Sequence, residues 1–186
     1  MSERQVIHVR TIQADVVKLG DDEIEVTGRL VDQRPGDQPT WFGVQKDATV
    51  HDMALTLRVR HPDLVITAAS ASMATHPYTI CPGAVPRVQQ LVGISVRHGF
   101  TRAVNERLGR RNGCSHLTAL VQAMGPVVRQ GAGAAFGNEA EMPRPGDGVW
   151  WVDTCHAWRE DGPLMDLVRA NDGDGLRSLS APGTAT

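Results

Sequence analysis

The sequence has few cysteines. The three that occur, Cys81, Cys114 and Cys155, are far apart in the chain. An odd number of widely spaced cysteines is not typical of a disulfide framework, so we expect free thiols. Each thiol is then core filler, a nucleophile or a metal ligand.

Long apolar runs and excess positive charge are also missing. No run approaches the roughly 18 residues that a membrane span requires, and residues 1–5 lack the basic and apolar segments of a secretion signal. Lys and Arg number 19 and Asp and Glu 21, a net charge of −2, whereas binding to a phosphate backbone requires a positive surplus. We expect a cytoplasmic protein with no membrane and no nucleic acid among its partners.

Three common catalytic signatures do not occur. The glycines of Gly131-Ala132-Gly133 follow a predicted helix instead of joining a strand to a helix, so they are not a phosphate-binding loop. Neither the Gly-x-Ser-x-Gly elbow nor the His-Glu-x-x-His pair is found, which argues against a serine hydrolase and a standard zinc protease.

The composition is that of a folded globular protein. The chain has 186 residues, of which 22% are charged and 41% hydrophobic, enough for one domain with a buried core. We predict a single domain over residues 1–170. Residues 171–186 are polar and contain glycine, which predicts a disordered tail.

The first third of the chain alternates between apolar and polar residues, which predicts half-buried antiparallel strands. The clearest strand contains Met53, Leu55, Leu57 and Val59 on one face. Further strands are predicted at 24–30 and from 64 toward 73, with an ambiguous one at 5–12 and a loop at 33–39. The sheet would have about four strands.

From Pro82 onward the apolar residues recur at helical spacing. Helices are predicted at 82–92, 100–108 and 114–128, and Pro126 should kink or end the third. Residues 131–148 are loop-like, and 150–152 could resume as a strand. Strands followed by helices predict an α+β fold, with three helices packed on one face of the antiparallel sheet.

Three residues at the ends of predicted elements could form a metal site. His51 continues the core-facing side of its strand, Cys81 precedes a helix that Pro82 can begin, and Cys114 opens the third helix. One imidazole and two thiolates suit zinc, or alternatively iron, with an exchangeable fourth position. The fourth ligand is left open between water, Cys155 and His156. Taken singly, each residue is better explained as buried core than as a ligand.

The sequence resembles an uncharacterised bacterial domain family over nearly its full length. The motifs are His51-Asp52-Met53, Pro77-Tyr78 with Cys81-Pro82, Gly113-Cys114-Ser115-His116-Leu117, and Cys155-His156-Ala157. It is more distantly similar to the U-type iron-sulfur cluster scaffold and zinc-binding sulfur-acceptor fold.

That second resemblance implies a metal-binding role for three positions. His51 falls where the scaffold family carries an aspartate, and Cys81 and Cys114 fall on its middle and late cysteines. Thr49 lies near its earlier cysteine and cannot replace it. This difference argues against cluster assembly and leaves a mononuclear metal site.

We therefore expect a metal-dependent enzyme, a lyase cleaving C–C or C–O bonds or a hydrolase, with a small organic molecule as substrate. His116 and Tyr78 are the candidate catalytic residues that move a proton. An iron-sulfur scaffold or sulfur carrier, and a partner subunit with a structural zinc, are the alternatives. Assembly into a homo-oligomer stays open.

Overall fold

The computed structural model describes residues 4–41, 43–97, 99–137 and 151–180. The chain forms two compact units, residues 1–137 and 138–186. The sequence predicted one domain over 1–170, whereas the structure divides the chain at Gly137.

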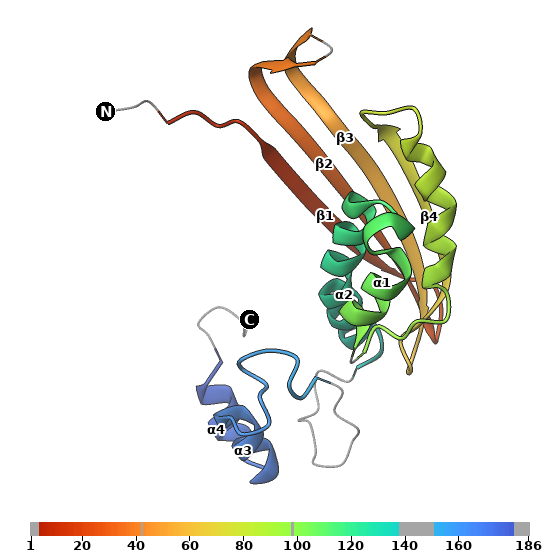
Figure 1. Cartoon of the computed structure of the whole chain (residues 1–186). Helices are drawn as coiled ribbons and strands as arrows, with labels where there is room; N and C mark the ends of the chain where they lie inside the picture. Colours follow the sequence, from red (N-terminus) through yellow and green to blue (C-terminus); the bar gives the residue numbers. More distant parts are fainter. Residues whose placement is uncertain (1–3, 42, 98, 138–150, 181–186) are drawn as a thin grey trace. The chain divides into compact units, whose positions relative to one another are not determined.

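The first unit is built on one four-stranded sheet (Figure 1). Its strands are β1 (Val9–Lys18), β2 (Glu23–Thr40), β3 (Gly43–Arg60) and β4 (Val65–Thr75), in the order β1-β2-β3-β4 with every pair antiparallel. The alternation in the sequence produces this sheet, because every second side chain of a strand faces the same side. Ile24, Val26 and Leu30 of β2 are fully buried on that side.

The predicted loop at 33–39 is instead part of β2. The pairing between β2 and β3 shifts after Asp32 and again between Arg34 and Asp37, and then continues to Thr40. Local irregularities of this kind let proline and glycine enter a strand pair without ending it. The hairpin therefore extends well past the end of the apolar alternation.

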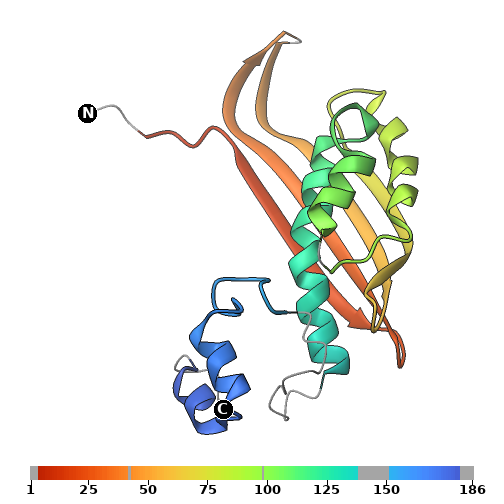
Figure 2. The same ribbon diagram turned by 60° about the horizontal axis from the view of Figure 1, so that its bottom comes forward.

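Helices cover one face of the sheet (Figure 2). They are η1 (Cys81–Leu91, a 3-10 helix), α1 (Phe100–Leu108) and α2 (Ser115–Phe136), with the short 3-10 turn η2 (Arg110–Asn112) before α2. The core lies between this layer and the sheet and includes Leu91, Val104 and Leu120. The predicted α+β fold, with one antiparallel sheet and helices on one face, is confirmed.

α2 does not end at Pro126. Val128 and Ala132 beyond the proline are buried in the core, and their burial favours continuing the helix despite the lost backbone hydrogen bond. The predicted loop at 131–148 was therefore wrong for 131–136. Of the predicted strand at 150–152, Trp151 and Val152 lie in a turn and residue 150 is outside the described residues.

The second unit contains α3 (Pro163–Arg169) and α4 (Gly173–Ser178). The Asp172 side chain caps α4 by accepting a hydrogen bond from the Gly175 backbone at 2.8 Å. Helix α4 lies where the sequence predicted a disordered tail.

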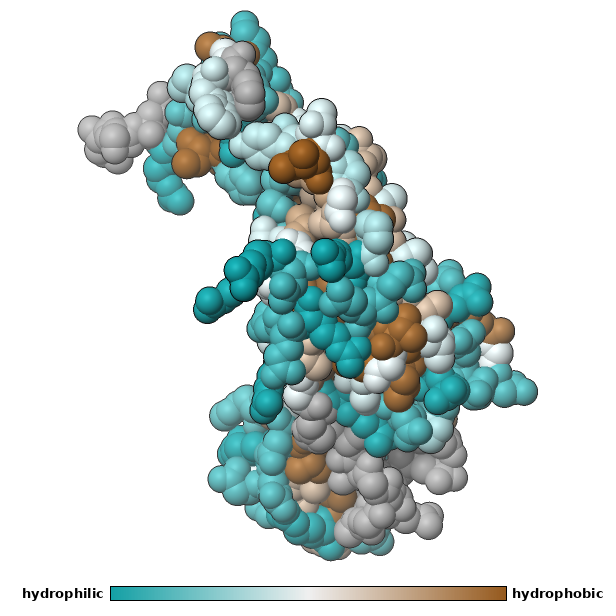
Figure 3. All heavy atoms as spheres, turned by 45° about the vertical axis from the view of Figure 1, so that its right-hand side comes forward, coloured by the Kyte–Doolittle hydropathy of each residue, from teal (hydrophilic) through white to brown (hydrophobic). Residues whose placement is uncertain are grey.

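In the described parts of the chain, no helix is long and apolar enough to cross a membrane. Much of the face drawn in Figure 3 is hydrophilic, and apolar side chains are exposed on it in small separate groups.

Candidate functional site

A buried carboxylate lies at the centre of the site. Asp32 of β2 is fully buried, because it continues the core-facing alternation of Val26 and Leu30. Arg10 of β1 binds it through two hydrogen bonds, from Nε to Oδ1 at 2.7 Å and from Nη2 to Oδ2 at 2.8 Å. This guanidinium lowers the pKa of Asp32 to about 2, against the opposing effect of burial. Asp32 is therefore ionised at neutral pH.

Three polar side chains form a row across the sheet at this level. In the strand register, Arg10 pairs with Asp32, and Asp32 pairs with His51 of β3. The Nδ1 atom of His51 lies 3.0 Å from Oδ2 of Asp32, and its side chain is only 12% exposed. His8, which precedes β1, places Nε2 3.2 Å from Oδ1 of the same carboxylate.

Irregular pairing occurs on both sides of His51. The β2–β3 register shifts between Asp32 and Gln33, and the β3–β4 register shifts between Asp52 and Met53. Such β-bulges re-aim side chains and are frequent beside functional sites.

His116 approaches the same carboxylate from the helical layer. It is the second residue of α2, and its Nε2 atom lies 3.5 Å from Oδ2 of Asp32. The rings of His51 and His116 are stacked, with centroids 3.6 Å apart and an interplanar angle of 30°. Burial lowers the pKa of both imidazoles, and for His116 the neighbouring His51 lowers it further. Both shifts favour the neutral form of the ring.

Asp32, His51 and His116 together are a candidate metal-binding group. Their ligand atoms all lie within 4.8 Å of one another. Among the described residues, no other set of three or more His, Cys, Asp or Glu side chains satisfies this distance. The predicted set of His51, Cys81 and Cys114 thus does not meet it.

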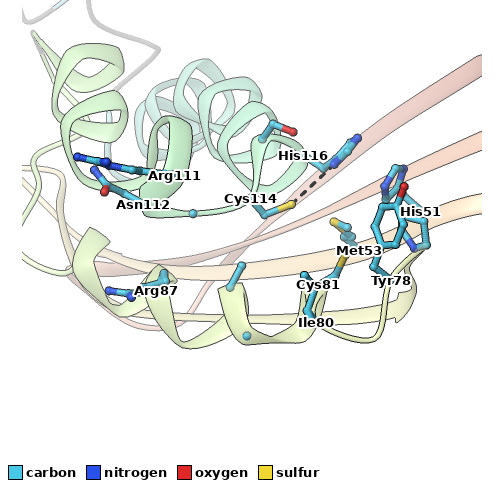
Figure 4. A pocket seen from close by; sticks show the side chains of 15 residues that line it. His51, Met53, Tyr78, Ile80, Cys81, Arg87, Arg111, Asn112, Cys114 and His116 are labelled. Carbon is cyan, nitrogen blue, oxygen red and sulfur yellow. Dashed lines mark hydrogen bonds between the residues drawn. The ribbon is translucent and has the colours of Figure 1, made fainter.

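The predicted residues do line one pocket (Figure 4). It has a volume of about 540 Å³ and lies between β3, the chain after β4, η1 and the start of α2. His51, Cys81, Cys114, His116 and Tyr78 all line it. Asp32 lies behind the two imidazoles and is not itself a lining residue.

Cys114, Tyr78 and Cys81 contribute the remaining reactive groups. Cys114 is the N-cap residue of α2, and its Sγ atom lies 3.7 Å from Nδ1 of His116. Tyr78 lies between β4 and η1 and is 47% exposed. Cys81 is the first residue of η1 and lines the same pocket. Each has access to a small molecule in the pocket.

Cys155 and His156, the proposed sources of a fourth ligand, lie in the second unit. Both side chains are exposed.

Sequence reasoning missed Asp32 and its partners Arg10 and His8. The available signal was the alternation itself, which places residue 32 on the core side after Leu30. Extending the strand by two residues would have put a carboxylate in the core, where it requires partners. His8 had no distinguishing pattern, because its contact with Asp32 depends on strand pairing across 24 residues.

The fold and site define an α+β protein with a buried carboxylate–imidazole cluster at one end of a pocket. The chain belongs to the family described as "protein of unknown function (DUF2889)", whose model matches residues 8–130. That range contains every residue of the cluster and both pocket cysteines. No curated protein and no solved structure matches the chain.

Proposed function

We propose that this protein is a metal-dependent enzyme acting on a small organic molecule, with a mononuclear zinc or iron ion held by Asp32, His51 and His116. The observation that carries the proposal is the convergence of one buried carboxylate and two imidazoles within 4.8 Å at the pocket. This ligand set replaces the cysteines of the sequence-based hypothesis with Asp32 and His116.

The chemistry of the three donors suits such an ion. Two imidazoles and one carboxylate are a common ligand set for catalytic zinc and for non-haem iron(II), and three protein ligands leave positions open for substrate. The lowered pKa values of His51 and His116 favour the neutral rings that metal binding requires. Arg10 and His8 hold the Asp32 carboxylate in place, as residues behind metal ligands commonly do.

A bound divalent ion would polarise a carbonyl or hydroxyl oxygen of the substrate, which suits hydrolysis or C–C or C–O cleavage. The protein itself supplies a pocket of the size used for small molecules, about 540 Å³. Tyr78 and Cys114 line it and are the groups placed to move a proton. His116, first expected to be such a group, takes the role of a ligand.

The test is metal analysis of chelator-washed protein reloaded with zinc or iron(II). We expect about one ion per wild-type chain, and loss of the ion in the His51→Ala and His116→Ala variants. His156→Ala is the matched control, because it removes an exposed imidazole from the second unit and should leave the metal content unchanged. Full retention of the ion by the His51→Ala/His116→Ala double variant would refute the proposal.

A second candidate uses the same side chains without a metal. Cys114, His116 and Asp32 follow one another as thiol, imidazole and carboxylate, at 3.7 Å and 3.5 Å. This order is that of a cysteine nucleophile with its base and orienting acid. Iodoacetamide would then modify Cys114 faster than Cys81 at pH 7, and His116→Ala would remove the difference in metal-free protein.

The alternatives from the sequence make different predictions. A sulfur carrier would acquire a persulfide on Cys81 or Cys114, detectable by mass spectrometry, or a coloured cluster after anaerobic reconstitution. A structural zinc would have four protein ligands, and loss of the ion in Cys155→Ala or His156→Ala would indicate it.

A further inference from the structure

The pocket has two chemically different ends (Figure 4). His51, His116 and Cys114 lie at one end, whereas Arg87 of η1 and Arg111 of η2 lie at the other. The two arginines come from different elements, and both line the pocket.

The lining of the pocket carries positive charge without compensation. Arg87 and Arg111 are lining residues, and no Asp or Glu is among the residues that line it. Within the described residues, neither guanidinium forms an ion pair or hydrogen bond, whereas most other arginines of the first unit have a carboxylate or carbonyl partner. Both arginines are exposed and available to a ligand.

Two free guanidinium groups at one pocket end are suited to an oxyanion. Arginine binds carboxylate and phosphate through planar, paired hydrogen bonds. The neighbouring side chains of Asn112 and Ser115 also line the pocket and add neutral hydrogen-bonding groups.

We propose that Arg87 and Arg111 form an anion-binding subsite for a carboxylate or phosphate group of the molecule that enters the pocket. The statement that this anionic group is part of a substrate rests on the proposed function. The subsite would hold the anionic end at the rim and direct the rest of the molecule toward His51 and His116. The substrate class is thus a small organic acid or phosphate ester.

The experiment is an NMR titration of metal-free protein with inorganic phosphate, with acetate, and with neutral acetamide. Removing the metal ensures that the anion does not bind through an ion. We expect phosphate, acetate or both to shift the backbone signals of residues 83–87 and 111–115, and acetamide to shift none. The anion that binds more tightly identifies the group that the subsite prefers.

Single variants Arg87→Gln and Arg111→Gln should each weaken anion binding by about fivefold or more, and the double variant should abolish it. Arg110→Gln is the matched control, since it removes the same charge from an adjacent exposed residue that does not line the pocket. Unchanged binding in the double variant, equal weakening by Arg110→Gln, or no anion-induced shifts in the wild type would each overturn the subsite.

Metal content is measured on the same variants after reloading. We expect Arg87→Gln and Arg111→Gln to retain the ion. Arginine variants that lose anion binding but keep the metal would support the subsite. A wild-type protein that binds the anion but never takes up metal would support the subsite and refute the metal proposal. The two failures are therefore distinguishable.

Discussion

At the scale of single residues, Asp32 is notable as a charged side chain that is fully buried in the first unit. Removing a carboxylate from water costs several kcal/mol unless charged and polar partners replace the solvent. Arg10 of β1 and His51 of β3 supply these partners from the two neighbouring strands, and His8 supplies another from just before β1. A group so fully surrounded has a fixed position, which is what a ligand or an orienting acid needs.

Asp32→Asn should lower the free energy of unfolding by about 2–3 kcal/mol, because Arg10 loses its charged partner and the amide donates where oxygen accepted. Asp52→Asn is the control. Asp52 has an equally close bidentate pair with Arg29, at 2.8 and 2.7 Å, but on the opposite face of the sheet with more exposure. That change should cost less than about 1 kcal/mol. Urea unfolding measures both, and equal losses would contradict the interpretation.

The depressed pKa of Asp32 predicts acid sensitivity in metal-free protein. Its pKa is about 2 in the folded chain, against 3.8 as the ordinary value. A group whose folded pKa is lowered stabilises the protein fully above its unfolded pKa, so this contribution declines from about pH 4 toward pH 2. The loss amounts to about 2 kcal/mol. Urea unfolding at pH 2–5 should show it in wild type, and the slope should be smaller in Asp32→Asn.

Local pattern identified some site residues and missed others. The strand alternation places His51 toward the core, and the break in pattern at Pro82 places Cys81 at a junction. Neither reveals which groups from distant segments meet. The contact of His116 with Asp32 joins residues far apart in the chain and depends on how α2 packs on the sheet.

At the scale of elements, close packing of α2 against β1 explains the glycine at position 131. A Cβ atom at Gly131 would lie 2.6 Å from Cγ1 and 3.0 Å from Cβ of Val16 in β1, whereas one at Gly133 would meet nothing within 4 Å. The Cβ of Val16 is fixed to the strand backbone, so no rotamer change relieves the contact.

Gly131→Ala should therefore destabilise the protein by about 1–3 kcal/mol, partly offset by the better helix propensity of alanine. Gly133→Ala in the same helix should instead stabilise it by up to about 1 kcal/mol. Thermal unfolding followed by circular dichroism compares the two. A stabilising Gly131→Ala would show that α2 lies farther from β1.

Whether a segment forms a helix or a strand was predictable where its buried residues recur at a regular spacing in the sequence. The helix expected at 100–108 has those bounds, and the strand through Met53 and Val59 is part of β3. The extensions of β2 and α2 were not predictable, because the polar hairpin and the helix past Pro126 are stabilised by pairing and packing with distant residues.

At the scale of the whole molecule, the main hydrophobic core lies in the first unit. The buried core residues run from Ile24 to Ala132. A fragment of residues 1–137 should therefore fold alone, with cooperative thermal unfolding and the metal stoichiometry of the full chain. Circular dichroism and metal analysis of this fragment check the prediction, and a non-cooperative transition would show that the second unit is required.

The β2–β3 hairpin has a consequence for how the chain can vary in length. An insertion or deletion of one residue between Ile24 and Asp32 would turn every later side chain of β2 to the opposite side, so the carboxylate would face solvent. The tip of the hairpin lies between Asp37 and its pairing partner Lys46, and it contains none of the three cluster residues. Natural variants should therefore gain and lose residues at the tip while keeping the spacing between the apolar alternation and the acid constant.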